Sequence, residues 1–167
     1  MRDEQQVMDG FCSWFAGYVA AFYTGNGADD RNIRLKEEHT AEVRSNAVLI
    51  AGTLGLDGRD RMLAETIGLF HDVGRFPQYR QYRTFRDSES VNHAARGAMV
   101  LIEEKVLGGL PREERDPVIR AVTLHNVFRL PPGLGDRLRT HAEIVRDADK
   151  LDIWRIFIEV LGQPEAE

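Results

Sequence analysis

An all-α fold of about six main helices is what this sequence predicts, and two observations carry the prediction. Apolar residues recur three and four positions apart in the segments between turns, a spacing that places them on one face of an α-helix. No segment shows the apolar–polar alternation of a half-buried strand. Internal repeats and low-complexity linkers are also absent from the sequence. We therefore expect the 167 residues to form one helical domain around one core.

The first predicted helix covers residues 2–23. Its apolar face is rich in aromatic residues and consists of Val7, Met8, Phe11, Trp14, Phe15, Tyr18, Val19 and Phe22. Such a stripe can line a cofactor or partner groove or support a dimer, but we interpret it as core packing. Residues 25–27 (Gly-Asn-Gly) break this helix, and Asp29 and Asp30 are expected to form a polar turn.

The second and third helices are expected to carry the first candidate ligands. The second is predicted over residues 32–54 and contains His39, which could also be a surface histidine among its neighbouring glutamates. Residues 55–58 form the next turn, and Asp60 helps to start the third helix. That helix ends with His71 and Asp72, and Gly74 is predicted to stop it.

Residues 77–89 are predicted to lack regular structure, because aromatic and basic side chains alternate there without a helical pattern. Long loops of this kind are often lids or binding loops, and the alternative is a solvated connector. Ser90 is the expected N-cap of the next helix, which carries His93, reaches Val106 and is ended by residues 108–109.

Two further helices complete the predicted fold. Pro111 and Arg112 open the first of them, which carries His125. Residues 131–133 (Pro-Pro-Gly) then form a hard break. The final helix follows and contains Asp149.

Composition excludes several classes of function. The content of 43% apolar and 29% charged residues is that of an ordinary soluble globular protein. The net charge of −5 argues against a nucleic-acid-binding or basic membrane-surface protein, although it allows a locally cationic site for a small anionic substrate. Cys12 is the single cysteine, so no intramolecular disulfide can form. Because no long apolar run or signal peptide is visible, we expect a cytoplasmic protein.

Six metal-competent side chains are distributed over the predicted helices. They are His39, His71, Asp72, His93, His125 and Asp149. Each histidine alone would more often be structural than a ligand, but together the six exceed what one tetrahedral zinc ion requires. The set suits two metals that share a bridging carboxylate and keep positions open for water and substrate.

The order of these residues resembles the HD-domain superfamily of metal-dependent phosphohydrolases. Three segments carry the resemblance: residues 38–40 (Glu-His-Thr), 69–75 (Leu-Phe-His-Asp-Val-Gly-Arg) and 146–152 (Arg-Asp-Ala-Asp-Lys-Leu-Asp). It spans roughly residues 33–154 and leaves the first helix, residues 1–24, outside. The last segment singles out Asp149 as the ligand, and Asp147 and Asp152 are expected to support it or to help start the helix.

The resemblance is to the binuclear, four-histidine members and implies a particular ligand set. His39, His71, Asp72 and Asp149 would hold one metal. Asp72 would bridge to a second metal completed by His93 and His125. The implied cofactors are two divalent ions per chain, drawn from Mn, Fe, Ni, Co and Zn, with Mg also compatible.

Arg75 is a departure from one branch of the family. A nucleotidase branch has a catalytic glutamate three residues after the aspartate of the doublet, where this chain has Arg75. The exchange disfavours a mononuclear nucleotidase and favours a cation that binds an anionic substrate, although a helix-end arginine would also fit. Lys150 is a second candidate for a phosphate contact, or it faces solvent. The arginines of the 77–89 segment, Arg80, Arg83 and Arg86, could widen a cationic mouth.

The resemblance implies a metal-dependent phosphohydrolase in which a metal-bridged hydroxide cleaves a small phosphate ester, a nucleotide-like monoester or diester. Asp72 and Arg75 would be catalytic. The expected partner is a small phosphorylated substrate, with no specific nucleic-acid binding, no membrane association and no predicted oligomeric state. Two alternatives share the ligand set: an HD-type di-iron oxygenase that uses O₂, and a non-catalytic HD module that binds a ligand.

Overall fold

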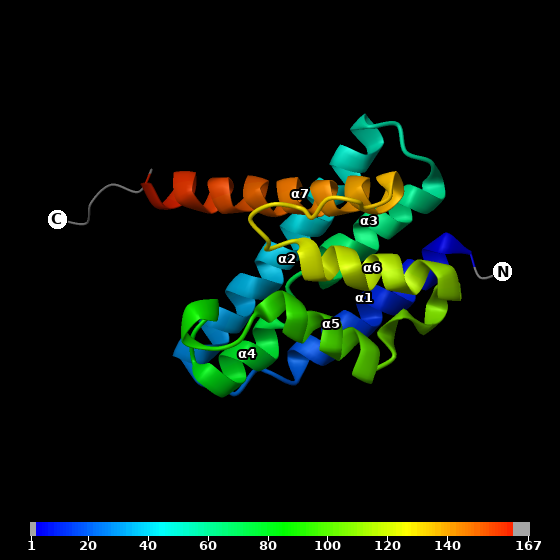
Figure 1. The fold of residues 1–167 in the computed structure, drawn as a ribbon. Coiled ribbons are helices and arrows are strands. Elements are labelled where there is room, and N and C mark those ends of the chain that lie inside the picture. The colour runs from blue at the N-terminus through cyan, green and yellow to red at the C-terminus, as the bar shows by residue number, and fades with distance from the viewer. Residues whose placement is uncertain (1–2, 162–167) are drawn as a thin grey trace.

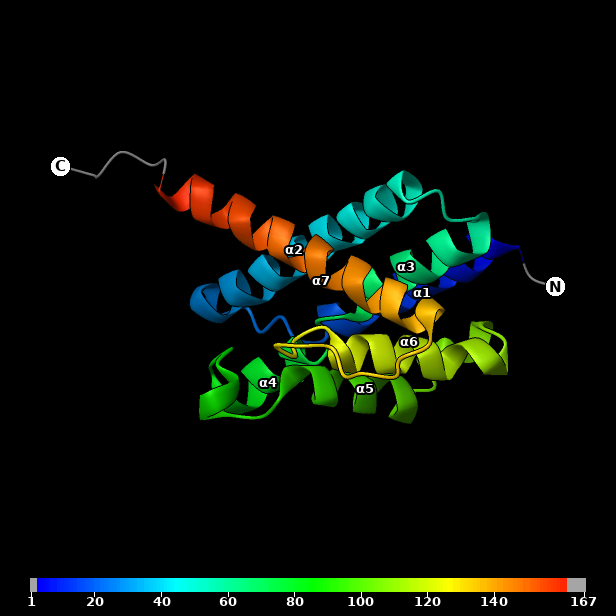
Figure 2. The same ribbon diagram turned by 45° about the horizontal axis from the view of Figure 1, so that its top comes forward.

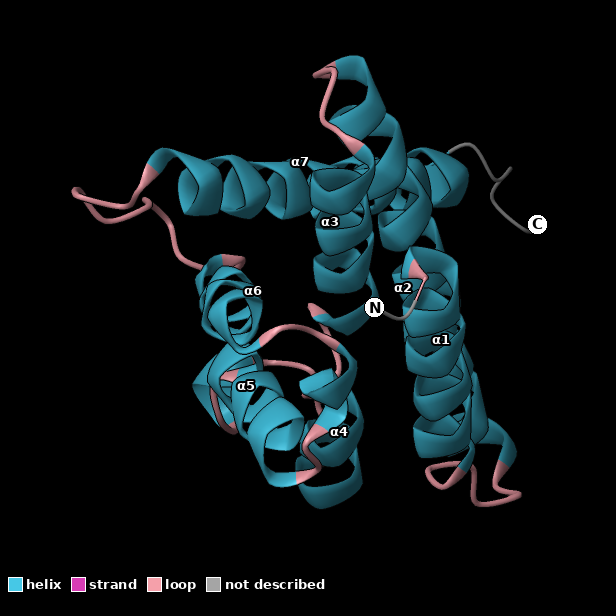
Figure 3. Cartoon of the chain, turned by 90° about the vertical axis from the view of Figure 1, so that its right-hand side faces the viewer, coloured by secondary structure: helices cyan, strands magenta, loops and turns pink. Residues whose placement is uncertain are grey.

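The structure, a computed structural model, describes residues 3–161 and confirms the all-α prediction. Over this range Figure 3 shows helices joined by loops, without a strand. The six expected helices are accompanied by a seventh, α4, which is only eight residues long. The helices are α1 (Glu4–Ala20), α2 (Gly27–Thr53), α3 (Gly58–Phe70), α4 (Arg75–Tyr82), α5 (His93–Glu103), α6 (Arg112–Leu124) and α7 (Asp136–Leu161), with 3₁₀ turns η1 (Asp87–Glu89) and η2 (Val106–Gly109).

Helix α3 lies in the middle of the bundle. Helix α3 packs most extensively against α2, and α7 crosses both of these helices (Figures 1 and 2). Helices α5 and α6 pack together on the other side, with α4 beside α5. The C-terminal ends of α3 and α6 and the start of α5 therefore converge beneath the middle of α2 and α7.

The aromatic face of α1 packs into the core, as the sequence predicted. The Phe11 ring meets Phe70 edge-on with 5.5 Å between ring centroids, and Phe15 meets Phe76 at 5.8 Å. Both α1 phenylalanines are buried, so this part of the face is used inside the molecule. Helix α1 begins at Glu4, and residue 2 of the predicted helix lies outside the described residues.

Helix α2 starts five residues earlier than predicted. Asn26 caps it by accepting hydrogen bonds from the backbone N–H groups of Ala28 and Asp29. Asp29 and Asp30, expected in a turn, lie in the first helical turn instead. Carboxylates are favourable at this end because the helix dipole is positive there, so acidic residues that looked like a turn belong to a helix start.

The prediction of an irregular segment at residues 77–89 is wrong. Helix α4 runs through its first half, and η1 occupies part of the second. Pro77 is the third residue of α4, where its missing N–H costs nothing because the first-turn N–H groups have no partner within the helix. The alternation of aromatic and basic residues is the pattern of a short amphipathic helix that buries Phe76 and Tyr79.

The limits of α5 also differ from those predicted. Asn92, rather than Ser90, is its N-cap and accepts a hydrogen bond from the N–H of Ala95 at 2.9 Å. The helix ends at Glu103, and Lys105 adopts a left-handed backbone conformation with φ of 52°. Val106, expected in the helix, therefore falls in η2.

The second half of α7 extends beyond the other helices, as Figures 1 and 2 show. Trp154 and Phe157, in this half, are largely exposed. Within residues 3–161 we find no helix with both the length and the apolar content needed to cross a membrane.

Candidate metal centre

The turn between α3 and α4 places the two central side chains. His71 is the C-cap of α3 and Asp72 follows it in the turn. Gly74 lies directly against the first turn of α5, because a Cβ there would be 2.1 Å from the carbonyl oxygen of His93 and 2.5 Å from the backbone nitrogen of Gly97. Gly74 was predicted to stop α3; instead, it ends this turn and lets the backbone approach α5 closely enough to bring His93 to Asp72.

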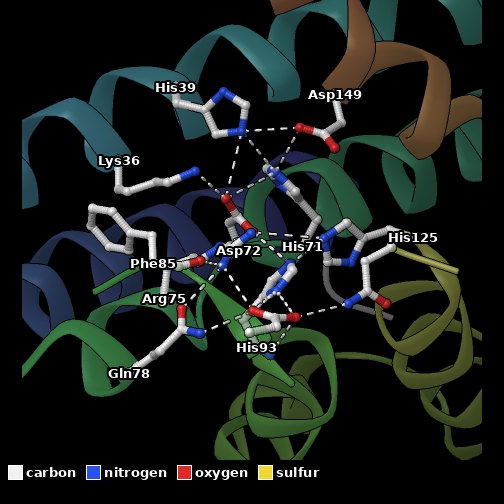
Figure 4. A network of polar contacts seen from close by, with 12 residues as sticks. Lys36, His39, His71, Asp72, Arg75, Gln78, Phe85, His93, His125 and Asp149 are labelled. Atoms are coloured by element: carbon white, nitrogen blue, oxygen red, sulfur yellow. Dashed lines mark hydrogen bonds and ion pairs between the residues drawn. The ribbon is translucent and has the colours of Figure 1, made fainter. Parts of the chain in front are cut away.

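Four histidines converge on Asp72, two on each of its carboxylate oxygens (Figure 4). The Nε2 atoms of His39 and His71 lie 3.6 and 3.8 Å from Oδ2. Those of His93 and His125 lie 3.3 and 3.6 Å from Oδ1. All five side chains are at most 5% exposed.

Asp149 joins the His39 and His71 half of this cluster from α7. Its Oδ1 atom is 3.1 Å from Nε2 of His39 and 3.9 Å from Nε2 of His71. The side chain of Asp149 is 21% exposed and so lies at the edge of the cluster. The structure thus brings together all six residues that the sequence singled out as ligands.

Each histidine is held so that the lone pair of Nε2 points into the cluster. Nδ1 of His71 donates to the carbonyl oxygen of Gly68 and Nδ1 of His125 to that of Val122, both at 2.7 Å. A carbonyl oxygen only accepts, so the Nδ1 atoms of these rings carry the proton.

The other two histidines are oriented by carboxylates. Nδ1 of His39 lies 2.6 Å from Asp152, and Nδ1 of His93 lies 2.8 Å from Asp87. A carboxylate or carbonyl behind the ring is the usual way in which a metal-binding histidine is fixed in one tautomer. All four Nε2 atoms are consequently available as ligands.

The protonation tendencies of the buried groups agree with ligand roles. Burial lowers the pKa of His71 to about 3 and that of His93 to about 4, so both rings are neutral near pH 7. Burial alone would raise the pKa of Asp72, but the Lys36 ammonium and the neighbouring imidazoles hold it well below its usual value. The carboxylate of Asp72 is therefore ionised.

His39 and Asp149 influence each other. Burial lowers the pKa of His39, but the hydrogen bonds with Asp149 and Asp152 and the negative charge of Asp72 together outweigh it, so the net pKa is raised. Burial raises the pKa of Asp149, but the hydrogen bond with His39 and the charges of the His71 and His39 rings together outweigh burial, so that the pKa of Asp149 is lowered. A metal ion at this position competes with a proton for Nε2 of His39, which makes binding pH-dependent.

The donor set fits divalent metal ions. The Nε2 atoms of His39 and His71 are 3.3 Å apart, and those of His93 and His125 are 3.0 Å apart. Two nitrogens bound at about 2.0–2.1 Å to one ion are separated by about 2.9–3.4 Å for octahedral or tetrahedral angles. Paired lone pairs beside an ionised carboxylate repel one another unless a cation lies between them.

A second group of polar residues supports these ligands. Asp152, buried in α7, accepts from His39 as described and also from Nε of Arg155 at 2.6 Å. Asp87 of η1 accepts from Nε2 of Gln78 at 2.9 Å and lies 3.3 Å from Nδ2 of Asn126. The sequence analysis named Asp152 as a residue that could support the ligand Asp149. It assigned no role to Asp87, which lies in the segment that was expected to be irregular.

Arg75 lies beside the cluster at the start of α4. Its Nε atom is 3.4 Å from Oδ1 of Asp72, and its Nη1 atom donates to Asp87 at 3.0 Å, to Gln78 at 3.1 Å and to the carbonyl oxygen of Phe85. The guanidinium therefore connects the central aspartate to the carboxylate that orients His93. It is not the helix-end arginine that was considered from the sequence, because it is the first residue of α4.

The other predicted cations have partners of their own. Lys150 is 58% exposed and its Nζ atom lies 3.7 Å from Asp147, the solvent-facing arrangement considered from the sequence. Arg80 donates to the carbonyl oxygen of Ala21, and Arg83 pairs with Asp29 at 2.6 Å.

Arg86 pairs with Glu89 at 2.8 Å. The arginines of the 77–89 segment thus contact helix ends and loop carboxylates rather than the histidine cluster.

Lys36 is a further site residue, besides Asp87, that the sequence reasoning missed. Its Nζ atom donates to Oδ2 of Asp72 at 2.9 Å, and its side chain is 18% exposed. One signal was available: Lys36 precedes His39 by three residues on α2, so both lie on the same helical face.

Comparison with known protein families matches residues 37–154 to the HD domain family model. The match covers more than half of the chain and contains all six clustered residues, so this chain belongs to the HD domain family. Members of this family are largely metal-dependent hydrolases that bind divalent metals. Searches against curated proteins and against solved structures gave no significant match.

Proposed function

We propose that this protein is a metal-dependent phosphohydrolase that cleaves a small phosphate ester, a nucleotide-like monoester or diester. The single observation that carries the proposal is the convergence of four Nε2 lone pairs, in two pairs, on the two oxygens of Asp72. Membership of the HD domain family supports the same class of reaction. We also propose that residues 1–167 act as one domain with its metal-site core at residues 33–154, because α1 shares the core with α3 and α4.

The proposed ligand set divides at Asp72. His39, His71 and Asp149 lie on the Oδ2 side, whereas His93 and His125 lie on the Oδ1 side. Divalent ions bound there would supply activation of a water and neutralisation of phosphoryl charge. Asp72 would hold the two halves of the site in register, because each of its oxygens serves one half.

The protein side chains have three further tasks in this proposal. Asp152 and Asp87 keep two of the rings in the tautomer that presents Nε2. Nε of Arg75 lies 3.4 Å from Oδ1 of Asp72, and we propose that the remaining nitrogen of Arg75, Nη2, contacts an oxygen of the substrate. Lys150 was a candidate for phosphate contact and remains a weaker proposal, since its side chain lies beside Asp147.

The test is turnover of a panel of phosphomonoesters and phosphodiesters by protein loaded separately with Mn²⁺, Fe²⁺, Co²⁺, Ni²⁺ and Mg²⁺. Metal content is measured on each sample first, so that an empty site is not mistaken for an inactive one. We expect hydrolysis of at least one ester class and its loss in Asp72→Ala. A fully loaded protein that hydrolyses no ester would contradict the proposal.

The same samples separate the two alternatives. Oxygen consumption by the iron-loaded protein, without ester hydrolysis, would identify the oxygenase. Full biological activity of a His71→Ala variant would identify a module that binds a ligand without catalysis.

A further inference from the structure

Four side chains form the solvent-accessible edge of the candidate metal centre. The side chains of Lys36, Arg75, Asp149 and Asp87 are 16–30% exposed, whereas the four histidines and Asp72 are 0–5% exposed. These four side chains are therefore the ones in the cluster that solvent reaches most directly. Two of them are cations, and both lie on the side of Asp72 opposite Asp149 in Figure 4.

The two cations differ in how firmly they are held. Nη1 of Arg75 donates to three acceptors and Nε lies 3.4 Å from Oδ1 of Asp72, which fixes the guanidinium and leaves Nη2 for the substrate contact proposed above. Arg75 is thus held as part of the framework of the site. Lys36 has three ammonium protons, and its hydrogen bond to Asp72 uses one of them. Its Nζ atom also lies 5.5 Å from the centre of the Phe85 ring, which holds the ammonium at the opening.

Within the described residues, the carboxylate that accepts from Lys36 is one that a metal ion would take over. A divalent ion on the Oδ2 side would occupy the same carboxylate oxygen, and two cations on one oxygen repel each other. The ammonium would then lose its hydrogen bond to Asp72. A substrate with negative oxygens would replace the carboxylate that Lys36 loses.

We infer that Lys36 is a second substrate-anion contact of this site beside Nη2 of Arg75, binding a non-bridging phosphoryl oxygen through its ammonium once metal has displaced it from Asp72. The inference rests on the proposed function and adds to it a residue and a role. The ammonium is a neutralising partner of Asp72 in the metal-free protein and a substrate contact in the loaded protein. Metal and Lys36 accordingly compete for Asp72, while substrate and Lys36 cooperate.

A purely structural role for Lys36 predicts the opposite effect on metal binding. If the ammonium held Asp72 in place for the metal, its removal would weaken metal affinity. If it competes with the metal, Lys36→Met will retain metal at least as well as the wild-type protein. Binding of inorganic phosphate to the loaded protein will become weaker by roughly ten- to a hundredfold, the usual cost of losing one charge-assisted hydrogen bond.

The experiment measures both quantities on the full chain loaded with Mn²⁺: metal affinity by chelator competition and the Kd for inorganic phosphate by calorimetry. Lys36→Met is compared with Lys36→Arg, which keeps the charge and is expected to retain most of the phosphate affinity. Lys105→Met is the matched control, because Lys105 is exposed between α5 and η2 and should behave as wild type.

Unchanged phosphate binding in Lys36→Met, or a loss of metal in that variant, would overturn the role inferred for Lys36 but leave the proposed function standing. A loaded wild-type protein that binds no phosphate would overturn this inference and the proposed function together. Weaker phosphate binding with retained metal would support it.

Discussion

Replacing Asp152 by asparagine tests how the first half of the metal centre is oriented. The Asp152 carboxylate is fully buried and accepts two hydrogen bonds, from Nδ1 of His39 and from Nε of Arg155, each at 2.6 Å. An asparagine of the same shape offers one oxygen and one NH₂ group to these two donors. At least one donor therefore loses its acceptor, and the choice of tautomer at His39 is weakened.

The expected magnitude follows from the role of such partners. Loss of a carboxylate behind a metal-binding histidine typically costs about 10–100-fold in metal affinity, or roughly 1.4–2.7 kcal/mol. The loss should fall on the ion held by His39. Asp87→Asn should instead weaken the ion held by His93, because Asp87 is the acceptor for that ring.

The assay is stepwise metal binding measured by competition with a chromophoric chelator. Glu143→Gln is the control, since it is the same type of change at an exposed position of α7. Two affinities that remain at wild-type values in Asp152→Asn would refute the reasoning. The division of ligands into two halves would be wrong if Asp152→Asn and Asp87→Asn weakened the same binding step.

Three other outcomes are expected. In urea titrations, Gly74→Ala should lower the free energy of unfolding by about 1–3 kcal/mol or more, because the added methyl group overpacks against His93. Gly17 is exposed in α1 with open space around it, so Gly17→Ala should raise the free energy of unfolding by up to about 1 kcal/mol. Removing metal with a chelator should lower Tm and readdition should restore it, because an ion that binds only the folded chain stabilises it; an unchanged Tm would count against an occupied site. Burial lowers the pKa of His141 from 6.5, whereas the pKa of Asp60 is lowered from 3.8 because the hydrogen bonds that Asp60 accepts outweigh its burial. Both groups therefore stabilise the fold at neutral pH and lose this contribution on acidification, His141 below pH 6.5 and Asp60 below pH 3.8. Asp60→Asn should lower stability at pH 7 and flatten the acid limb of the curve of stability against pH, and a curve parallel to that of the wild type would contradict the argument.

Six of the helices could be predicted from the sequence because each has apolar residues three and four positions apart. Errors arose where a local pattern has two physical outcomes. Asp29 and Asp30 suit a turn as well as a helix start, and the Asn26 cap decides for the helix. Pro77 suggests a break, but in a first turn it is compatible with a helix. The seventh helix was missed for this reason.

The candidate ligands could be picked out from the sequence, whereas the residues around them could not. Metal-binding side chains are restricted to a few types, so His71, Asp72 and their partners stood out in a sequence with only five histidines. Lys36 and Asp87 belong to common residue types whose roles depend on what they face. Only the fold shows that Lys36 reaches Asp72 and that Asp87 supports His93.

The central claim, that two divalent ions lie one on each side of Asp72, is tested most directly by anomalous diffraction from crystals of the Mn²⁺-loaded protein. The account predicts two peaks, one among His39, His71, Asp149 and Oδ2 of Asp72, and the other among His93, His125 and Oδ1. Loaded crystals with no peak at these side chains, or with metal bound elsewhere on the chain, would contradict it.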